Sequence, residues 1–225
     1  MKKYALILLV LGCVYAPVST VMAAGLGISF PSAFGTTKYD NYDADASQFG
    51  INFIFDTNVA RNSLFNYRLN FGVEFFNHDF SFEYEYFNYD YYITDYATYS
   101  GTHEGIRIVA DNTFGFGIVK SPVIRLWMGP NIRFGFIAGD ETGITVGAGA
   151  TILGLNFNMG RVFTLALEAG YLFDADIYFD SRYVEFYSYE AGTWVEDYSD
   201  TGINNLFTIK LSILFRIRDN YENDF

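Results

Sequence analysis

The stretch Phe65–Phe76, which has the sequence FNYRLNFGVEFF, decides the fold. From Phe65 to Phe75 every second residue is aromatic or large and aliphatic, and the residues between them are polar, charged or glycine. Successive side chains of a β-strand point to opposite faces, so this alternation predicts a strand with one apolar face. Arg68 and Glu74 both fall on the opposite face.

Seven other segments alternate in the same way. Each is long enough to cross a bilayer as a tilted strand, which takes about 9–11 residues. None shows a convincing helical period. The eight predicted strands are Gly25–Phe34, Gln48–Asp56, Phe65–Phe76, Gly105–Val119, Val123–Ile137, Ile144–Phe157, Phe163–Asp174 and Ile203–Arg216.

The charged residues within these strands all lie on the face opposite the bulky apolar side chains. An Arg or Lys that faces lipid costs about 2–4 kcal/mol near the middle of the membrane, so a lipid-facing surface excludes charge. We therefore expect the apolar faces to contact lipid and the charged faces to line a closed barrel. The predicted lumen charges are Asp56, Arg68, Glu74, Arg107, Asp111, Arg125, Arg133, Glu168, Lys210 and Arg216.

Several of these charges have an opposite charge at a similar height on a neighbouring strand, which predicts ion pairs that fill the barrel. Arg133 and Arg216 have no evident carboxylate and are expected to contact water. Eight strands leave room inside only for side chains or one small ligand, so a wide aqueous channel is excluded. The expected pairs are Glu168 with Lys210, Glu74 with Arg107, and Asp56 with Arg68.

Three places break the alternation. Asn112 has the lipid-facing parity, Pro130 removes a hydrogen bond from its strand, and from Leu153 onward the apolar residues change faces. A β-bulge shifts the alternation by one residue, so each place is a candidate bulge.

The N-terminus is typical of an export signal. Lys2 and Lys3 precede the apolar stretch Tyr4–Ala16, and we expect cleavage after Ala23, which removes residues 1–23. A lipoprotein site at Cys13, the only cysteine, is an alternative, but apolar residues continue beyond it. Cleavage removes two lysines and no acid, so the formal net charge changes from −12 to −14, which disfavours nucleic acid as a partner.

A soluble eight-stranded barrel of the lipocalin type also has one apolar and one polar face. The apolar face of this chain is too bulky for the inside of eight strands, and the polar face carries few of the Lys and Glu residues that a water-exposed exterior needs. We therefore predict an all-β, eight-stranded antiparallel up-and-down transmembrane β-barrel that occupies residues 24–225.

Short and long connections alternate along the chain. The predicted loops 35–47, 77–104 and 175–202 are long and hold most of the acidic residues, whereas the loop 138–143 is short. Outer-membrane barrels have short periplasmic turns and longer external loops. These four loops are thus expected to be extracellular, with both termini periplasmic.

This pattern resembles the small outer-membrane barrels of diderm bacteria, namely the OmpA transmembrane domain and the OmpX/Ail and OmpW types. The resemblance covers the mature chain and rests on architecture, not on a motif. It implies a monomer in outer-membrane lipid, with an aromatic assembly signal at the end of the last strand. Either Phe225 or the segment Lys210–Ile217 could supply that signal.

Two of the long loops continue the strand alternation and predict hairpins that stand above the barrel. Tyr and Trp give a large contact area at a low cost in entropy, which suits a recognition surface for a basic protein or a host-surface partner. Anchoring at the lipid headgroups is an equal alternative for the tyrosines near the membrane. The candidate recognition residues are Tyr84, Tyr86, Tyr91, Tyr92, Tyr187, Tyr189 and Trp194.

The sequence therefore favours a structural or adhesion-like surface barrel. A narrow channel for small or apolar solutes, as in the OmpW type, is the alternative. A lipid-modifying enzyme is disfavoured, because the only histidines, His78 and His103, lie in no hydrolase-like motif.

Two acidic clusters lack the glycine and terminal glutamate of a calcium loop, so neither metal nor cofactor is expected. The clusters are Asp40, Asp43 and Asp45, and Asp174, Asp176 and Asp180.

Overall fold

The computed structural model describes residues 24–39, 42–57, 59, 64–88, 93–121, 123–139, 141–160, 162–188 and 193–216. Of the residues in these ranges, only the backbone is described at 82, 84–88, 93–97, 99, 180–188 and 193–200. The expected export signal 1–23 and Phe225 lie outside the described residues. None of the described segments is a helix long and apolar enough to cross a membrane.

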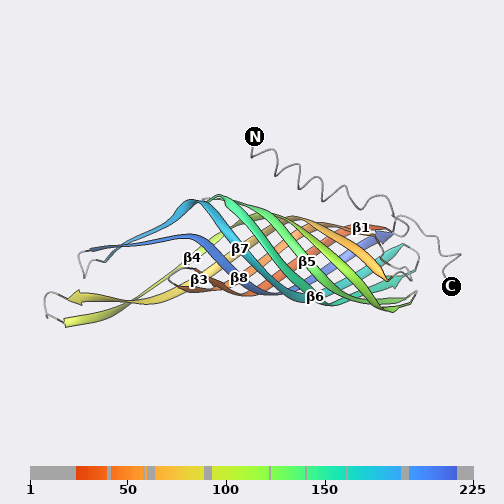
Figure 1. The fold of residues 1–225 in the computed structure, drawn as a ribbon, viewed down its shortest axis with the longest axis horizontal. Coiled ribbons are helices and arrows are strands. Elements are labelled where there is room, and N and C mark those ends of the chain that lie inside the picture. The colour runs from red at the N-terminus through yellow and green to blue at the C-terminus, as the bar shows by residue number, and fades with distance from the viewer. Residues whose placement is uncertain are drawn as a thin grey trace.

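Eight antiparallel strands close into a barrel, as predicted. Each strand pairs with the next in chain order, and β8 pairs with β1 to complete the ring (Figure 1). The strands are β1 Gly25–Lys38, β2 Asp43–Asp56, β3 Phe65–Asn88, β4 Ile93–Lys120, β5 Ile124–Ala138, β6 Gly143–Met159, β7 Phe163–Ser188 and β8 Thr193–Arg216.

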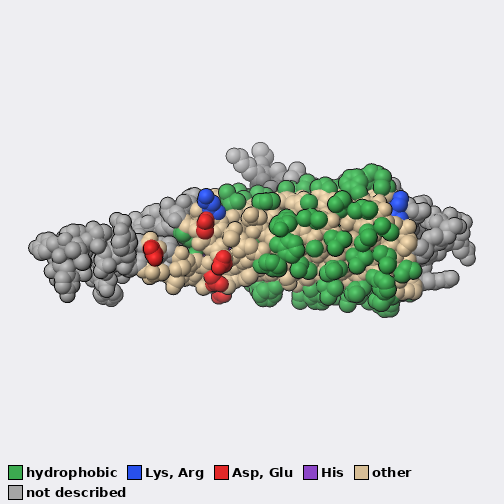
Figure 2. All heavy atoms as spheres, turned by 90° about the horizontal axis from the view of Figure 1, so that it is seen from below, with side chains coloured by type: hydrophobic (Ala, Val, Ile, Leu, Met, Phe, Trp, Pro, Cys, Tyr) green, Lys and Arg blue, Asp and Glu red, His purple; other side chains and the backbone are tan. Residues whose placement is uncertain are grey.

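The apolar faces point outward and the charged faces point inward. Phe71 is 49% exposed and Leu211 is 45% exposed, whereas Arg133 and Glu168 are each 2% exposed. Figure 2 shows the apolar side chains gathered around the barrel away from the hairpins, with acidic side chains beyond them on the hairpin side. This inside-out arrangement is the one that a lipid solvent favours.

Only one of the three candidate bulges is correct as placed. The β6–β7 register shifts between Thr151 and Leu153, so Ile152 and Leu153 both face outward. Asn112 keeps its outward parity without a register shift, and its Oδ1 accepts a hydrogen bond from the hydroxyl of Tyr67. Pro130 stays in register with β6 and is exposed on the outer face.

Two pairs of strands extend beyond the others at one end of the barrel (Figure 1). Pairing of β3 with β4 continues to Asn88 and Ile93, and pairing of β7 with β8 continues to Ser188 and Thr193. The segments 35–47, 77–104 and 175–202, predicted as loops, are therefore largely paired strand.

On β2 and β3 the apolar alternation stops earlier than the backbone pairing, which explains the difference in the ends of these two strands. Asp45 and Asp79 are register partners on the outer face, and both are exposed. Past the lipid zone an outward residue no longer needs to be apolar, although the ladder of hydrogen bonds continues.

Val59, which lies between β2 and β3 in the chain, is inside the barrel at the end opposite the hairpins. Val59 is fully buried there, in a cluster with Ile54, Ala166 and Leu214. The Nδ2 of Asn156 donates a hydrogen bond of 2.9 Å to the carbonyl oxygen of Val59. Val59 therefore covers the interior at this end of the barrel, which we call the short-turn end because short connections join the strands there.

Candidate functional site

The barrel interior is the first candidate site, because every second residue of each strand projects into it. Its described charges are six acids and six bases, so their formal charges cancel. All twelve are buried: Asp56, Glu74, Asp111, Glu168, Asp174, Asp176, Arg68, Arg107, Arg125, Arg133, Lys210 and Arg216.

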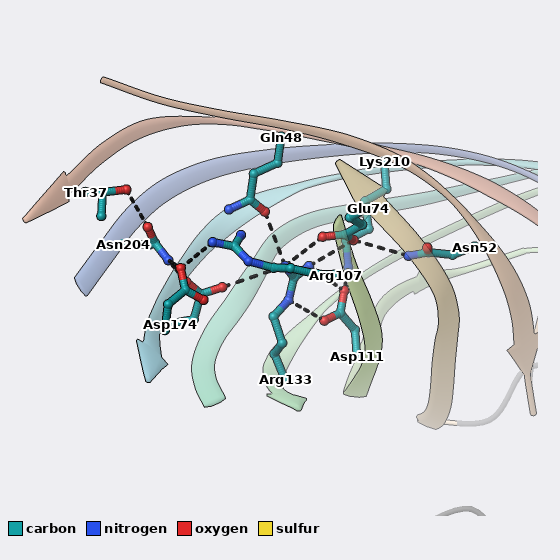
Figure 3. A network of polar contacts seen from close by, with 11 residues as sticks. Thr37, Gln48, Asn52, Glu74, Arg107, Asp111, Arg133, Asp174, Asn204 and Lys210 are labelled. Carbon is teal, nitrogen blue, oxygen red and sulfur yellow. Dashed lines mark hydrogen bonds and ion pairs between the residues drawn. The ribbon is translucent and has the colours of Figure 1, made fainter. Parts of the chain in front are cut away.

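Arg133 is the centre of the polar network in the middle of the barrel (Figure 3). Its Nε donates to Oδ1 of Asp111 at 2.7 Å, and its Nη1 donates to Oε2 of Glu74 at 2.8 Å. Oδ2 of Asp174 lies 3.7 Å from the same Nη1. The prediction that Arg133 lacks a carboxylate partner was therefore wrong: it contacts carboxylates from β3, β4 and β7.

Lys210 joins the same centre. Its Nζ lies 2.6 Å from Oδ2 of Asp111, which places a second cation on that carboxylate. Lys210 and Glu168 are register partners, as the sequence suggested, but the described ion pair of Glu168 is with Arg68. The predicted pairing of Glu168 with Lys210 is thus replaced by pairs that cross the lumen.

A second group of charges lies nearer the hairpin end. Arg107 forms an ion pair with Asp176, and not with its register partner Glu74 as predicted. The Nδ2 of Asn204 donates to Oδ1 of Asp174 at 2.5 Å and to Oδ2 of Asp176 at 2.8 Å. The two aspartates were expected in a surface cluster, yet both are buried inside the barrel.

A third group lies nearer the short-turn end. Nη2 of Arg68 is 2.5 Å from Oδ2 of Asp56, as predicted, and Nη1 is 2.5 Å from Oε1 of Glu168. The guanidinium also stacks on the buried ring of Trp127, 4.7 Å from its centroid. Arg216, which was expected to contact water, donates a hydrogen bond to the carbonyl oxygen of Gly160.

Arg125 lies beside this third group. Its side chain is buried, and its Nη2 lies 3.4 Å from Oδ1 of Asn66.

Aromatic side chains cover the mouth of the barrel at the hairpin end. Tyr39 and Tyr42, from the connection between β1 and β2, pack with Phe76, Phe80 and Tyr178 in one buried cluster, which we call the mouth cap. The hydroxyl of Tyr39 lies 2.6 Å from Nδ1 of His78. Sequence reasoning missed this cap, because Phe76 and Phe80 have the inward parity expected for polar residues.

Ion pairs and hydrogen bonds between the described side chains cross the lumen. One cavity, lined by Gln48, Glu74, Arg133 and Lys210 among others, has a volume of about 10 Å³, which is about the space that one water molecule needs. Within the described ranges, no group of three His, Cys, Asp or Glu side chains is placed to hold a metal ion.

The candidate recognition residues lie outside the described side chains. The backbones of Tyr84 and Tyr86 belong to β3, and Tyr187 and Trp194 are register partners in the β7–β8 pair. Tyr91, Tyr92 and Tyr189 lie outside the described residues altogether.

No family model matches the sequence, and no curated protein is significantly similar to it. Several solved structures match, and two of them are covered along most of their length. The crystal structure of Neisserial surface protein A (NspA) has a TM-score of 0.35 and 9% identity, with 86% of this chain and 97% of that chain covered. The structure of Ail, the attachment invasion locus protein of Yersinia pestis, in complex with the heparin analogue sucrose octasulfate, has a TM-score of 0.33 and 16% identity, with 87% and 99% covered.

The chain has the fold of a closed eight-stranded antiparallel β-barrel with an apolar outer face. This assignment depends on the closed ring of strands and on the outward apolar face. Similarity at these TM-scores adds no argument about function.

Proposed function

We propose that this protein is a surface recognition protein of the outer membrane of a diderm bacterium, in which the barrel is a closed anchor and the two hairpins contact the partner. The observation that carries this proposal is the neutral, ion-paired interior between the mouth cap and Val59. Ion pairs that cross the lumen leave little space for a solute to pass through it. The β3–β4 and β7–β8 hairpins are the described elements that extend past the barrel (Figure 1).

We place the hairpins outside the cell and the short turns in the periplasm. Short periplasmic turns and longer external segments are the rule for barrels of this type. The ends of β1 and β8 that lie beside the short turns, Gly25 and Arg216, are register partners, so both ends of the chain leave the barrel on the periplasmic side.

The exposed charges at the hairpin end favour a cationic partner. The outer faces of β2, β3 and β4 expose Asp43, Asp45, Asp79, Glu83 and Glu104 there. The first three line a groove of about 320 Å³ at the foot of the β3–β4 hairpin. Opposite charge raises association rates and selects partners, so a basic protein surface fits this end of the barrel.

A polyanion has a charge of the same sign as this acidic surface, so the surface repels it. The heparin analogue bound to Ail is such a polyanion. We therefore expect heparin not to bind this chain, although the two barrels share a fold.

The test is a shortened hairpin. Ser81 and Ser100 are register partners, so residues 82–99 can be replaced by an Asn-Gly turn at that level without removing Phe80 from the mouth cap. We expect the shortened protein to assemble normally and to lose adhesion to host cells. It should bind a fluorescent octalysine peptide more weakly, because Glu83 is removed while Asp43, Asp45 and Asp79 remain in the groove. Unchanged adhesion and peptide binding would contradict the proposal.

A matched variant tests whether the charge of the groove, and not its shape, accounts for binding of the peptide. Asp43→Asn with Asp45→Asn keeps the strand and the groove but removes two carboxylates. We expect weaker octalysine binding and a smaller dependence of that binding on salt. Heparin is the control ligand of opposite charge, and it should bind neither protein.

The ion pairs that cross the lumen argue against the channel alternative. Planar-bilayer recordings of the protein at neutral pH should show no conductance. Steady single-channel currents there would favour the narrow-conduit function.

A further inference from the structure

The two hairpins differ at their bases, where each extends past the strand beside it (Figure 1). The last register pair of β3 with β2 is Phe80 with Ala44, and the last pair of β7 with β6 is Tyr178 with Gly143. Outward side chains can be compared at equal distances along the strands from these pairs. They are polar on β3, namely Asn77, Asp79 and Ser81, and apolar on β7, namely Ala175, Ile177 and Phe179.

The second strand of each hairpin shows the same difference. Glu104 of β4 pairs with Asn77 and is exposed on the outer face. Ile203 of β8 pairs with Ala175 and is 55% exposed. A carboxylate in lipid is costly. Asp79 and Glu104 therefore indicate that water reaches the base of the β3–β4 hairpin.

Phe179 is held at the level of the connection between β5 and β6. Its backbone amide donates a hydrogen bond of 2.9 Å to the carbonyl oxygen of Thr142. The β7–β8 register shifts between Ile177 and Arg182, and such an irregularity bends a strand and redirects side chains. The side chain of Phe179 is 64% exposed, the highest value for a large apolar residue within the described part of the chain.

The apolar outer face is taller on β7 than on β3, which lies across the ring. The described outward residues of β7 are apolar or aromatic throughout Phe163–Phe179, whereas on β3 this holds only for Phe65–Phe75. At about 3.3 Å per residue and a strand tilt of about 40°, these runs are about 40 Å and about 25 Å tall. The shorter run matches the apolar band of about 25 Å that is usual for such barrels.

The neighbouring strands continue this difference around the ring. The outward residues of β5 and β6 are apolar throughout Ile124–Ala138 and Ile144–Met159. On β1 the apolar face ends before Thr36 and Lys38, and on β2 it ends before Ser47. The tall side of the apolar face is therefore β5–β7, and the short side is β1–β3.

We propose that the acyl chains of the lipids at the hairpin end rise along β7 and cover Ile177 and Phe179, so that the membrane is thicker beside β5–β7 than beside β1–β3. The patch formed by Ile177 and Phe179 is continuous with the lipid-facing surface, because no polar outward residue of β7 separates them. An apolar stretch that exceeds the thickness of the hydrocarbon is accommodated by tilting or by local thickening of the bilayer.

The lower end of β7 favours thickening over tilting. Phe163 and Phe65 are the first residues of β7 and β3, and both are exposed at the short-turn end. A rigid tilt that moves Phe179 into lipid would move Phe163 toward water. Local thickening covers both ends of the β7 run.

One consequence is that the bases of the two hairpins lie in different surroundings. The base of the β7–β8 hairpin lies in lipid, whereas the acidic groove at the foot of the β3–β4 hairpin stays in water. A partner of this groove would then approach from the side of β1–β3. The inference concerns lipid alone and does not rest on the proposed cationic partner.

Spin labels at matched positions test the proposal. Phe179→Cys and Ser81→Cys each place a nitroxide one residue beyond the last register pair described above. Ile177→Cys and Asp79→Cys form a second pair that keeps Phe179. All are made with Cys13→Ser, because Cys13 is the only native cysteine. The heat-dependent gel shift checks that each labelled protein is folded.

The measurement is the relaxation of each label by two reagents in nanodiscs of palmitoyl-oleoyl phosphatidylcholine. Oxygen concentrates in the hydrocarbon, and a nickel chelate stays in water. We expect oxygen to relax the labels at 179 and 177 more strongly, and the nickel chelate to relax those at 81 and 79 more strongly. The ratio of the two effects should differ several-fold within each pair.

Three results would overturn the proposal. Equal ratios within both pairs would show a lipid boundary of even height around the barrel. A label at 179 that is shielded from both reagents would show a protein contact, such as a second copy of the chain, in place of lipid. A label at Phe163→Cys that prefers the nickel chelate would show that the barrel tilts, because local thickening keeps this position in the hydrocarbon.

Discussion

Arg133 and Asp111 are register partners on β5 and β4, and their side chains form a two-point ion pair inside the barrel. Nε of Arg133 is 2.7 Å from Oδ1 of Asp111, and Nη2 is 3.1 Å from Oδ2. This contact fixes the plane of the guanidinium. Its remaining edge then faces Glu74 and Asp174 across the lumen, which links neighbouring and distant strands in one network.

Removal of Arg133 should therefore destabilise the barrel strongly. Arg133→Gln leaves Glu74, Asp111 and Asp174 without their shared cation, and loss of one partner of a buried ion pair costs about 3–5 kcal/mol. Urea unfolding in lipid vesicles, followed by the heat-dependent gel shift of folded barrels, measures this loss. Arg216→Gln is the control: Arg216 donates to a backbone carbonyl at the barrel end, so its loss should cost less. Equal stability of Arg133→Gln and the unaltered protein would contradict the network.

A glycine inside β6 makes room for the tryptophan. A Cβ atom at Gly154 would lie 2.2 Å from Cε2 of Trp127, which is fully buried. Gly154→Ala should therefore lower stability by about 1–3 kcal/mol through overpacking. Ile152→Leu, on the outer face of the same strand, should leave the unfolding midpoint nearly unchanged. If the two substitutions had equal effects, Trp127 would not be packed against β6 inside the barrel.

A charged side chain on the outer face should lower the free energy of unfolding. Leu211→Arg on β8 places a cation in the lipid, with an expected loss of about 2–4 kcal/mol if the residue lies near the middle of the membrane. Leu211→Met keeps the surface apolar and serves as the control. The unfolding free energy in vesicles measures both. An arginine that is tolerated as well as methionine would show that this face does not contact lipid.

The alternation of side chains was enough to predict the strands, the closure and the direction of the ten expected lumen charges. The alternation within each strand indicates which face contacts lipid, because a charged side chain on that face lowers the stability of the barrel. The positions of Asp174 and Asp176 were nevertheless predicted wrongly. On β7 the outward residues stay apolar at Ala175, Ile177 and Phe179, so Asp174 and Asp176 keep the inward parity. They were assigned to a surface cluster because the predicted strand ended at Asp174, before this continued alternation.

The ion-pair partners could not be predicted from neighbouring strands alone. Arg133 on β5 contacts Glu74 on β3, and Arg68 on β3 contacts Glu168 on β7. These contacts cross a narrow lumen, and their geometry depends on strand tilt and on register shifts such as the bulge at Ile152 and Leu153. The mouth cap was missed for a similar reason, since its aromatic residues come from separate strands and meet only when the ring is closed.

Fluorescence quenching by lipid tests the inside-out barrel most directly. The chain has two tryptophans, and Trp127 is buried in the lumen. One protein keeps only Trp127, through Trp194→Phe, and a second carries Phe71→Trp with both native tryptophans changed to Phe. In vesicles with brominated acyl chains, we predict strong quenching of the tryptophan at position 71 and weak quenching of Trp127. Weak quenching at position 71 with strong quenching of Trp127 would contradict the account.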